Sequence, residues 1–111
     1  MTHWLKINYR HLSPSDALDD RIKALADKLA RMADHRIQSM NVIIEAPNKP
    51  HTSGHPFRVH LDFQMPGKHM AVSHDPGNKN AHDDVYVALR DAFRAAERQV
   101  QTHADKLTAH H

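Results

Sequence analysis

The sequence predicts an α+β fold, a two-layer sandwich in which a four-stranded mixed sheet of order 1-2-3-4 is covered on one face by two helices. Two segments carry apolar residues at helical steps of three and four, and four others alternate polar with apolar residues. Each alternating segment has a single apolar face, so both helices must cover the same side of the sheet. The expected order of elements is β-α-β-β-β-α.

Both helices are predicted from apolar stripes and from the residues that precede them. The motif "SPSD" opens the first helix: Ser13 can cap it, Pro14 suits its first turn, and Asp16 favours the positive end of the helix dipole. The second helix follows "DD" (83–84) and should run to about residue 107. The stripes are Leu18, Ile22, Leu25, Leu29 and Met32 in the first helix, and Val85, Leu89, Ala92, Phe93, Ala96, Val100 and Leu107 in the second.

Strands are expected around residues 5–9, 40–44, 57–65 and 68–73. A right-handed crossover through the first helix makes the first two strands parallel neighbours, and short connections make the others an antiparallel meander. The turn "MPGK" (65–68) has proline and glycine in its central positions. A two-residue turn there pairs Met65 with Lys68, Phe63 with Met70 and Leu61 with Val72, which keeps the apolar partners on one face.

Length and composition indicate one domain, at residues 1–107, followed by a short tail at 108–111. The 111 residues can bury a core, and the absence of cysteine excludes disulfides and thiolate metal sites. No apolar run reaches the length of a signal peptide or a membrane span, so we expect a soluble, cytoplasmic protein without a membrane partner. The net charge is +2, and twelve histidines can add to it when protonated.

The helices present basic residues away from their apolar stripes. In the second helix Arg90, Arg94 and Arg98 recur every four residues, and in the first helix Arg21 and Lys28 lie at heptad spacing with Arg31 adjacent. Two neighbouring helices would gather these groups into one basic surface. Because guanidinium groups bind phosphate through two hydrogen bonds, such a surface is typical of RNA binding.

The same charges also fit a surface of ordinary salt bridges. Asp27 can pair with Arg31 and Lys23, while Asp91 and Glu97 lie three residues from Arg94. Charge placement alone leaves both interpretations open.

The sequence offers little for metal binding or catalysis. His51 and His55 are four residues apart in a Pro/Gly loop, and His60 and His69 share the open sheet face only as diagonal neighbours, so no set of zinc ligands converges. Phosphate-binding glycine loops and catalytic motifs are absent, and serines such as Ser73 have no evident base partner. We therefore expect neither an enzyme nor a cofactor nor a small-molecule substrate.

The segment "DDVYVALRDAFRAAERQVQTHADKL" (83–107) resembles the final helix of the ribosome hibernation-promoting factor family, once labelled sigma-54 modulation protein. "SDALDDRIKALADKLARM" (15–32) is similar to its first helix. The resemblance implies a monomer that binds 16S rRNA of the 30S subunit in the 70S ribosome, blocks the mRNA and tRNA channel, and inhibits translation in stationary phase or stress. It also implies that Lys28, Arg98 and Lys106 occupy basic positions of the family.

The chain departs from this family at several basic positions. Arg90 stands where the family usually has an acid, and Ala95, Thr102 and Ala104 stand where it often has lysine. The alternative is therefore a divergent paralogue, a protein-interaction or stress adaptor that uses the open sheet face and does not bind the ribosome.

Overall fold

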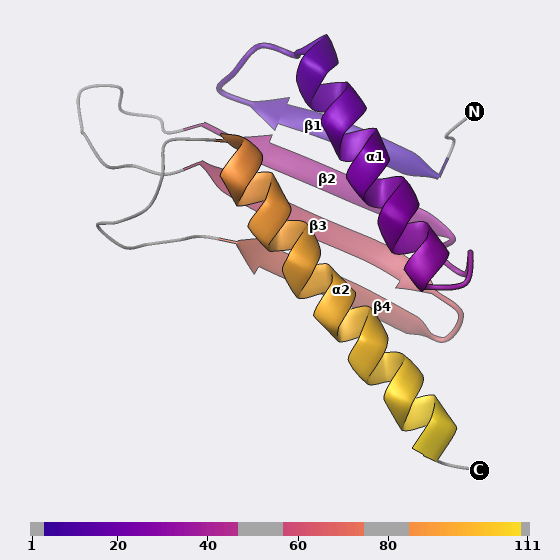
Figure 1. Cartoon of the computed structure of the whole chain (residues 1–111). Helices are drawn as coiled ribbons and strands as arrows, with labels where there is room; N and C mark the ends of the chain where they lie inside the picture. The colour runs from indigo at the N-terminus through magenta and orange to yellow at the C-terminus, as the bar shows by residue number, and fades with distance from the viewer. Residues whose placement is uncertain (1–3, 47–56, 75–84, 110–111) are drawn as a thin grey trace.

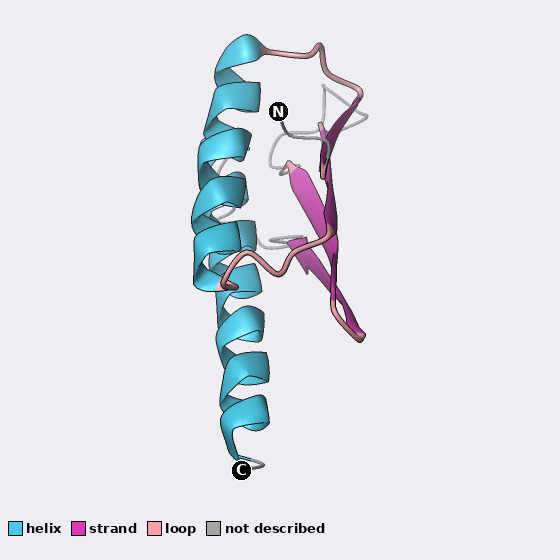
Figure 2. Cartoon of the chain, turned by 90° about the vertical axis from the view of Figure 1, so that its right-hand side faces the viewer, coloured by secondary structure: helices cyan, strands magenta, loops and turns pink. Residues whose placement is uncertain are grey.

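The computed structural model describes residues 4–46, 57–74 and 85–109. The elements are β1 (Leu5–Arg10), α1 (Asp16–Met32), β2 (Ser39–Glu45), β3 (Arg58–Met65), β4 (Lys68–His74) and α2 (Val85–Ala109). Figures 1 and 2 show the strands in one layer and both helices on one side of it. The predicted fold class, element order and coverage of a single sheet face are confirmed.

The sheet has the order β1-β2-β3-β4. β1 pairs with β2 in parallel, and the other two pairings are antiparallel, as predicted. At the β3–β4 turn the register joins Met65 to Lys68, so the alignment expected from the two-residue turn is correct. Gly67 in this turn has a φ of +71°, which a residue without a Cβ adopts at little cost.

The core lies between the sheet and the helices. Its largest fully buried side chains include Phe63, Ile22 and Phe93, one each from β3, α1 and α2. Along both helices the buried positions follow the predicted stripes, although Met32 at the end of the first stripe is 42% exposed. The burial of Leu107, predicted at the end of the second stripe, lies outside what the structure describes. Within the residues that the structure describes, no helix is both long and apolar enough to cross a membrane.

The start of α1 differs from the prediction. Ser15, not Ser13, is the N-cap: its backbone is extended and its side chain accepts a hydrogen bond from the amide of Leu18 at 3.3 Å. The helix therefore begins at Asp16, and Pro14 precedes the cap instead of lying in the first turn. Any serine followed closely by an acid is a plausible cap, and the chain entering from β1 decides which one is used.

A tyrosine connects β1 to the start of α1. The hydroxyl of Tyr9 donates to the Asp19 carboxylate at 2.5 Å and lies 3.3 Å from the carbonyl of Ser15. Partial burial, reinforced by the hydrogen bond to Asp19, raises the pKa of Tyr9 to about 12. This contact joins the sheet to the helix layer at the β1 edge.

At the other end of the chain, α2 ends at Ala109, two residues beyond the expected end. Two predicted features lie outside the described residues: the Pro/Gly loop with His51 and His55, and the acidic pair Asp83–Asp84 before the second helix.

Candidate nucleic-acid interface

The two helices lie side by side on the sheet and run in the same direction (Figure 1). An ion pair connects them: Lys28 Nζ of α1 lies 3.6 Å from Glu97 Oε2 of α2. This contact identifies the side of each helix that faces the other. Residues one heptad away from Lys28 or Glu97 lie on the same sides, so Arg21 of α1 and Arg90 of α2 flank the seam between the helices.

The seam carries the basic residues predicted on α1 and the first two predicted on α2. All are exposed, and Arg31 and Arg94 lie on the outward faces of their helices, opposite the buried stripes. Arg90 contacts its neighbour Asp91, with Nη2 3.1 Å and Nε 3.2 Å from the carboxylate. Two of the seam cations, Lys28 and Arg90, are therefore each paired with a carboxylate of their own.

The salt bridges expected in the alternative interpretation do not form as predicted. Between Asp27 and either Arg31 or Lys23 the structure shows no ion pair, all three being described residues. Glu97 contacts Lys28 across the seam instead of Arg94 on its own helix. In the described part of the chain Arg21, Arg31 and Arg94 form no ion pair with a carboxylate, although Asp20 and Asp27 are also exposed on the outward side of α1.

The remaining two predicted cations lie on the opposite side of α2, against β4. Arg98 and Lys106 line a groove of about 440 Å³ that also includes Lys68 at the start of β4. The other lining residues are Met70, Ala95, Gln99, Thr102 and His103. The groove brings a cation of the β3–β4 hairpin beside two of the helix, and none of the described residues that line it is acidic.

Lys68 was missed in the sequence-based prediction. In the alternating pattern of β4, Lys68 falls on the same face of the sheet as buried Met70, and its partner across the turn is buried Met65. Only the position of α2 along β4 shows that its side chain is exposed beside Arg98. That position is supported by a hydrogen bond from Gln99 Nε2 to the carbonyl of Ala71 at 3.2 Å.

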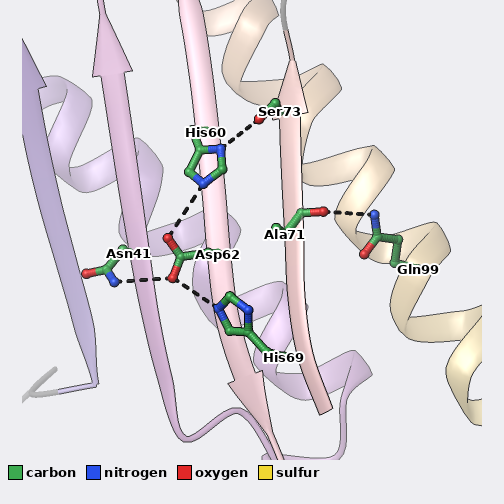
Figure 3. A network of polar contacts seen from close by, with 7 residues as sticks. All are labelled: Asn41, His60, Asp62, His69, Ala71, Ser73 and Gln99. Atoms are coloured by element: carbon green, nitrogen blue, oxygen red, sulfur yellow. Dashed lines mark hydrogen bonds and ion pairs between the residues drawn. The ribbon is translucent and has the colours of Figure 1, made fainter.

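The open face of the sheet has a different electrostatic arrangement, centred on one carboxylate (Figure 3). Asp62 accepts a hydrogen bond from Asn41 Nδ2 at 3.3 Å, and its two oxygens lie 3.6 Å from His60 Nε2 and 3.5 Å from His69 Nε2. His60 Nδ1 lies 2.7 Å from Ser73 Oγ. The expectation that Ser73 has no base partner is therefore wrong.

This network does not resemble a metal site. Among the residues that the structure places, no group of three or more histidine, cysteine or acidic residues could hold a metal ion. His60 and His69 both reach Asp62, so they are linked through the carboxylate and are not merely diagonal neighbours. Because the side chains of His60 and His69 are exposed, their contacts with Asp62 contribute little to stability.

Comparisons with known proteins support the resemblance found in the sequence. Residues 5–108 match the family model described as "Sigma 54 modulation protein / S30EA ribosomal protein". No curated protein sequence gives a significant match to the chain.

Similar solved structures include the N-terminal domain of Protein Y from Thermus thermophilus. It is 22% identical, with a TM-score of 0.69, and the alignment covers 88% of this chain and 94% of that one. A ribosomal subunit interface protein from Coxiella burnetii is 16% identical, with a TM-score of 0.70, covering 91% of this chain and 97% of the other. At these identities the likeness establishes a shared fold.

Proposed function

Because the chain belongs to the family of sigma 54 modulation proteins and S30EA ribosomal proteins, we propose that it is a cytoplasmic, ribosome-associated translation inhibitor. It binds as a monomer to the 16S rRNA of the 30S subunit, alone or in the 70S ribosome. There it occupies the channel of mRNA and tRNA in stationary phase or stress. It acts by occupying space and carries out no chemical reaction.

One observation supports RNA backbone as the ligand: exposed cations on the helix layer that lack carboxylate partners. Within the described residues this holds for Arg21, Arg31, Arg94, Arg98 and Lys106. Like charges spaced along a helix repel by a few tenths of a kcal/mol per pair, so folding alone gives little reason to keep Arg94 and Arg98 four residues apart. Arg31 and Lys106 differ, because each lies in the last turn of its helix, where a cation also stabilises the helix end. Phosphates would neutralise these cations, and each would release a condensed counterion on binding.

Lys28 and Arg90 have a smaller role in this proposal. Each must exchange a carboxylate for a phosphate, so part of the gain from the new contact is lost. The two residues would adjust the charge of the seam, while the unpaired cations provide most of the affinity.

The salt dependence of association with purified 30S subunits tests the electrostatic mechanism. If three to five cations neutralise phosphates, the logarithm of the binding constant should fall with the logarithm of salt concentration with a slope of about −2 to −4. Sucrose-gradient sedimentation at several salt concentrations measures this slope. A slope near zero would rule out binding through backbone electrostatics.

Charge reversal at Arg94 tests the helix surface itself. Arg94→Glu removes one phosphate contact and adds repulsion, so association with 30S subunits should weaken by more than tenfold. Lys23→Glu is the matched control, since Lys23 is exposed on the side of α1 away from the seam. Equal sedimentation of wild type and Arg94→Glu would favour the adaptor alternative, in which the open sheet face binds a protein partner.

A further inference from the structure

The groove between β4 and α2 differs from the seam because no acid among the described residues forms an ion pair with its cations. In the seam, Glu97 and Asp91 contact Lys28 and Arg90. In the groove, neither Lys68, Arg98 nor Lys106 has a carboxylate partner among the described residues. The acid nearest in sequence, Asp105, accepts a hydrogen bond from Gln101 at 3.0 Å instead.

The two elements that form the groove, β4 and α2, are held in place by the fold. Gln99 bonds to the backbone of β4 and so fixes α2 against the edge strand. The two-residue turn at Gly67 fixes the start of β4, where Lys68 lies. Lys68 and Arg98 thus belong to two elements whose separation is set before any ligand arrives, which lowers the entropic cost of binding to them.

The groove also has an apolar floor and neutral polar groups. Met70 is buried beneath it and Ala95 lies on the helix side, while Thr102 and His103 add a hydroxyl and an imidazole. Its volume of about 440 Å³ falls within the roughly 300–1,000 Å³ typical of small-ligand sites. Such a site suits a nucleotide, whose phosphate would contact the cations while its ribose and base cover the apolar floor.

We infer that this groove binds a single-stranded segment of RNA, with a backbone phosphate held by Lys68, Arg98 and Lys106 and one nucleoside packed against Met70 and Ala95. The inference rests on the proposed function and makes it more specific. It adds the β3–β4 hairpin to the RNA-binding surface and divides that surface into two parts, the seam and the groove.

Fluorescence anisotropy with a labelled ten-nucleotide uridine RNA tests the inference on the full chain without ribosomes. Lys68→Gln and Lys106→Gln should each weaken binding about five- to tenfold, and each should reduce the magnitude of the salt slope by less than about 0.7, the value for one neutralised phosphate of a single strand. Lys23→Gln is the matched control and should change the affinity less than twofold. Urea unfolding of each variant shows whether the fold is retained. An affinity of Lys68→Gln within twofold of wild type would overturn the inference.

Two further measurements separate the groove from other binding modes. NMR titration with the same RNA should shift the methyl signals of Met70 and Ala95. Leu25 and Met32 lie three and four residues from Lys28, on the seam side of α1. Shifts confined to these two residues would place the RNA at the seam and overturn the inference. Competition with ADP distinguishes RNA from free nucleotide. RNA binding should withstand ADP up to millimolar concentration, and displacement below that would replace the RNA assignment with a free-nucleotide site.

Sedimentation of wild type and Lys68→Gln with 30S subunits distinguishes failure of the groove from failure of the proposed function. If wild type does not sediment with 30S subunits, the proposed function fails, and the uridine RNA still decides whether the groove binds single strands. If both proteins sediment equally and the RNA affinities also agree, the groove is excluded while ribosome association stands.

Discussion

Along the β1 edge the sheet and the helix layer are joined by the Tyr9–Asp19 contact, whereas along the β4 edge the same two layers leave a groove lined by cations. At the first edge a charged side chain meets a partner from the other layer at 2.5 Å. At the second edge Gln99 bonds to a backbone carbonyl, and the cations around it contact no acid within the described chain. Polar groups thus contribute to holding α1, while α2 depends mainly on its buried apolar stripe.

The contrast shows which charges serve the fold. Asp19 stabilises the junction of β1 with α1, so its presence has a structural explanation. Lys68 and Arg98 have no carboxylate partner among the described residues, and Lys106 serves the fold only through its place in the last turn of α2. The mutual repulsion of the three cations opposes the arrangement slightly. Charged residues that the fold does not need are the ones to test for binding.

Removing the anchor of α2 should produce the largest effect. Phe93 is fully buried, and Phe93→Ala should lower the free energy of unfolding by about 3–5 kcal/mol because it leaves a cavity under α2. Urea denaturation followed by circular dichroism measures the loss. Met32→Ala, at the 42% exposed end of the α1 stripe, is the control and should cost about 1 kcal/mol or less. Similar losses for both variants would show that the core beneath α2 does not anchor it.

At the other edge, Tyr9→Phe should lower the free energy of unfolding by about 1 kcal/mol at neutral pH, since it removes a hydrogen bond but keeps the ring. The same urea experiment measures it. A variant as stable as wild type would show that the bond between β1 and α1 gives no net stabilisation.

The same pair predicts a dependence on alkaline pH. The pKa of Tyr9 is raised to about 12 in the folded protein, against about 10 when unfolded. The contribution of the neutral phenol is therefore complete below pH 10 and is lost as pH rises from about 10 to 12. Wild-type stability should fall more steeply than that of Tyr9→Phe across this range. Parallel curves of stability against pH for the two proteins would contradict the raised pKa of Tyr9.

The smallest effect is expected at the seam. Glu97→Gln releases Lys28 from its ion pair, and association with 30S subunits should strengthen about two- to fivefold, while stability changes by about 1 kcal/mol or less. Asp27→Asn makes the same change in net charge on α1 but breaks no ion pair of the described structure. An equal gain in that control would show that net charge, and not the release of Lys28, controls affinity.

Most of the fold could be predicted because local patterns determine it. Alternation and the turn "MPGK" were sufficient to predict the β3–β4 register. The handedness of the crossover was sufficient to predict the parallel pairing of β1 with β2. The N-cap was predicted at Ser13 but lies at Ser15, because both serines precede an acid closely and local sequence does not distinguish them.

The candidate site could be predicted only in part. Helical spacing showed that the predicted cations are exposed, since exposure depends on one helix at a time. Spacing cannot show which acid on one helix reaches which cation on another, so the Lys28–Glu97 pair was missed. Lys68 was missed for the same reason, because its position beside Arg98 depends on how α2 lies along β4.

The length of α2 has a consequence for the end that carries Lys106. Among the α2 side chains whose burial is described, Val100 is the last buried one, and in Figures 1 and 2 the helix continues past the end of the sheet. These final turns rely on their own backbone hydrogen bonds, so they can fray at little cost to the rest of the domain. Helix formation at this end would then depend on contact with a polyanion. Part of the binding free energy would be used to order these turns.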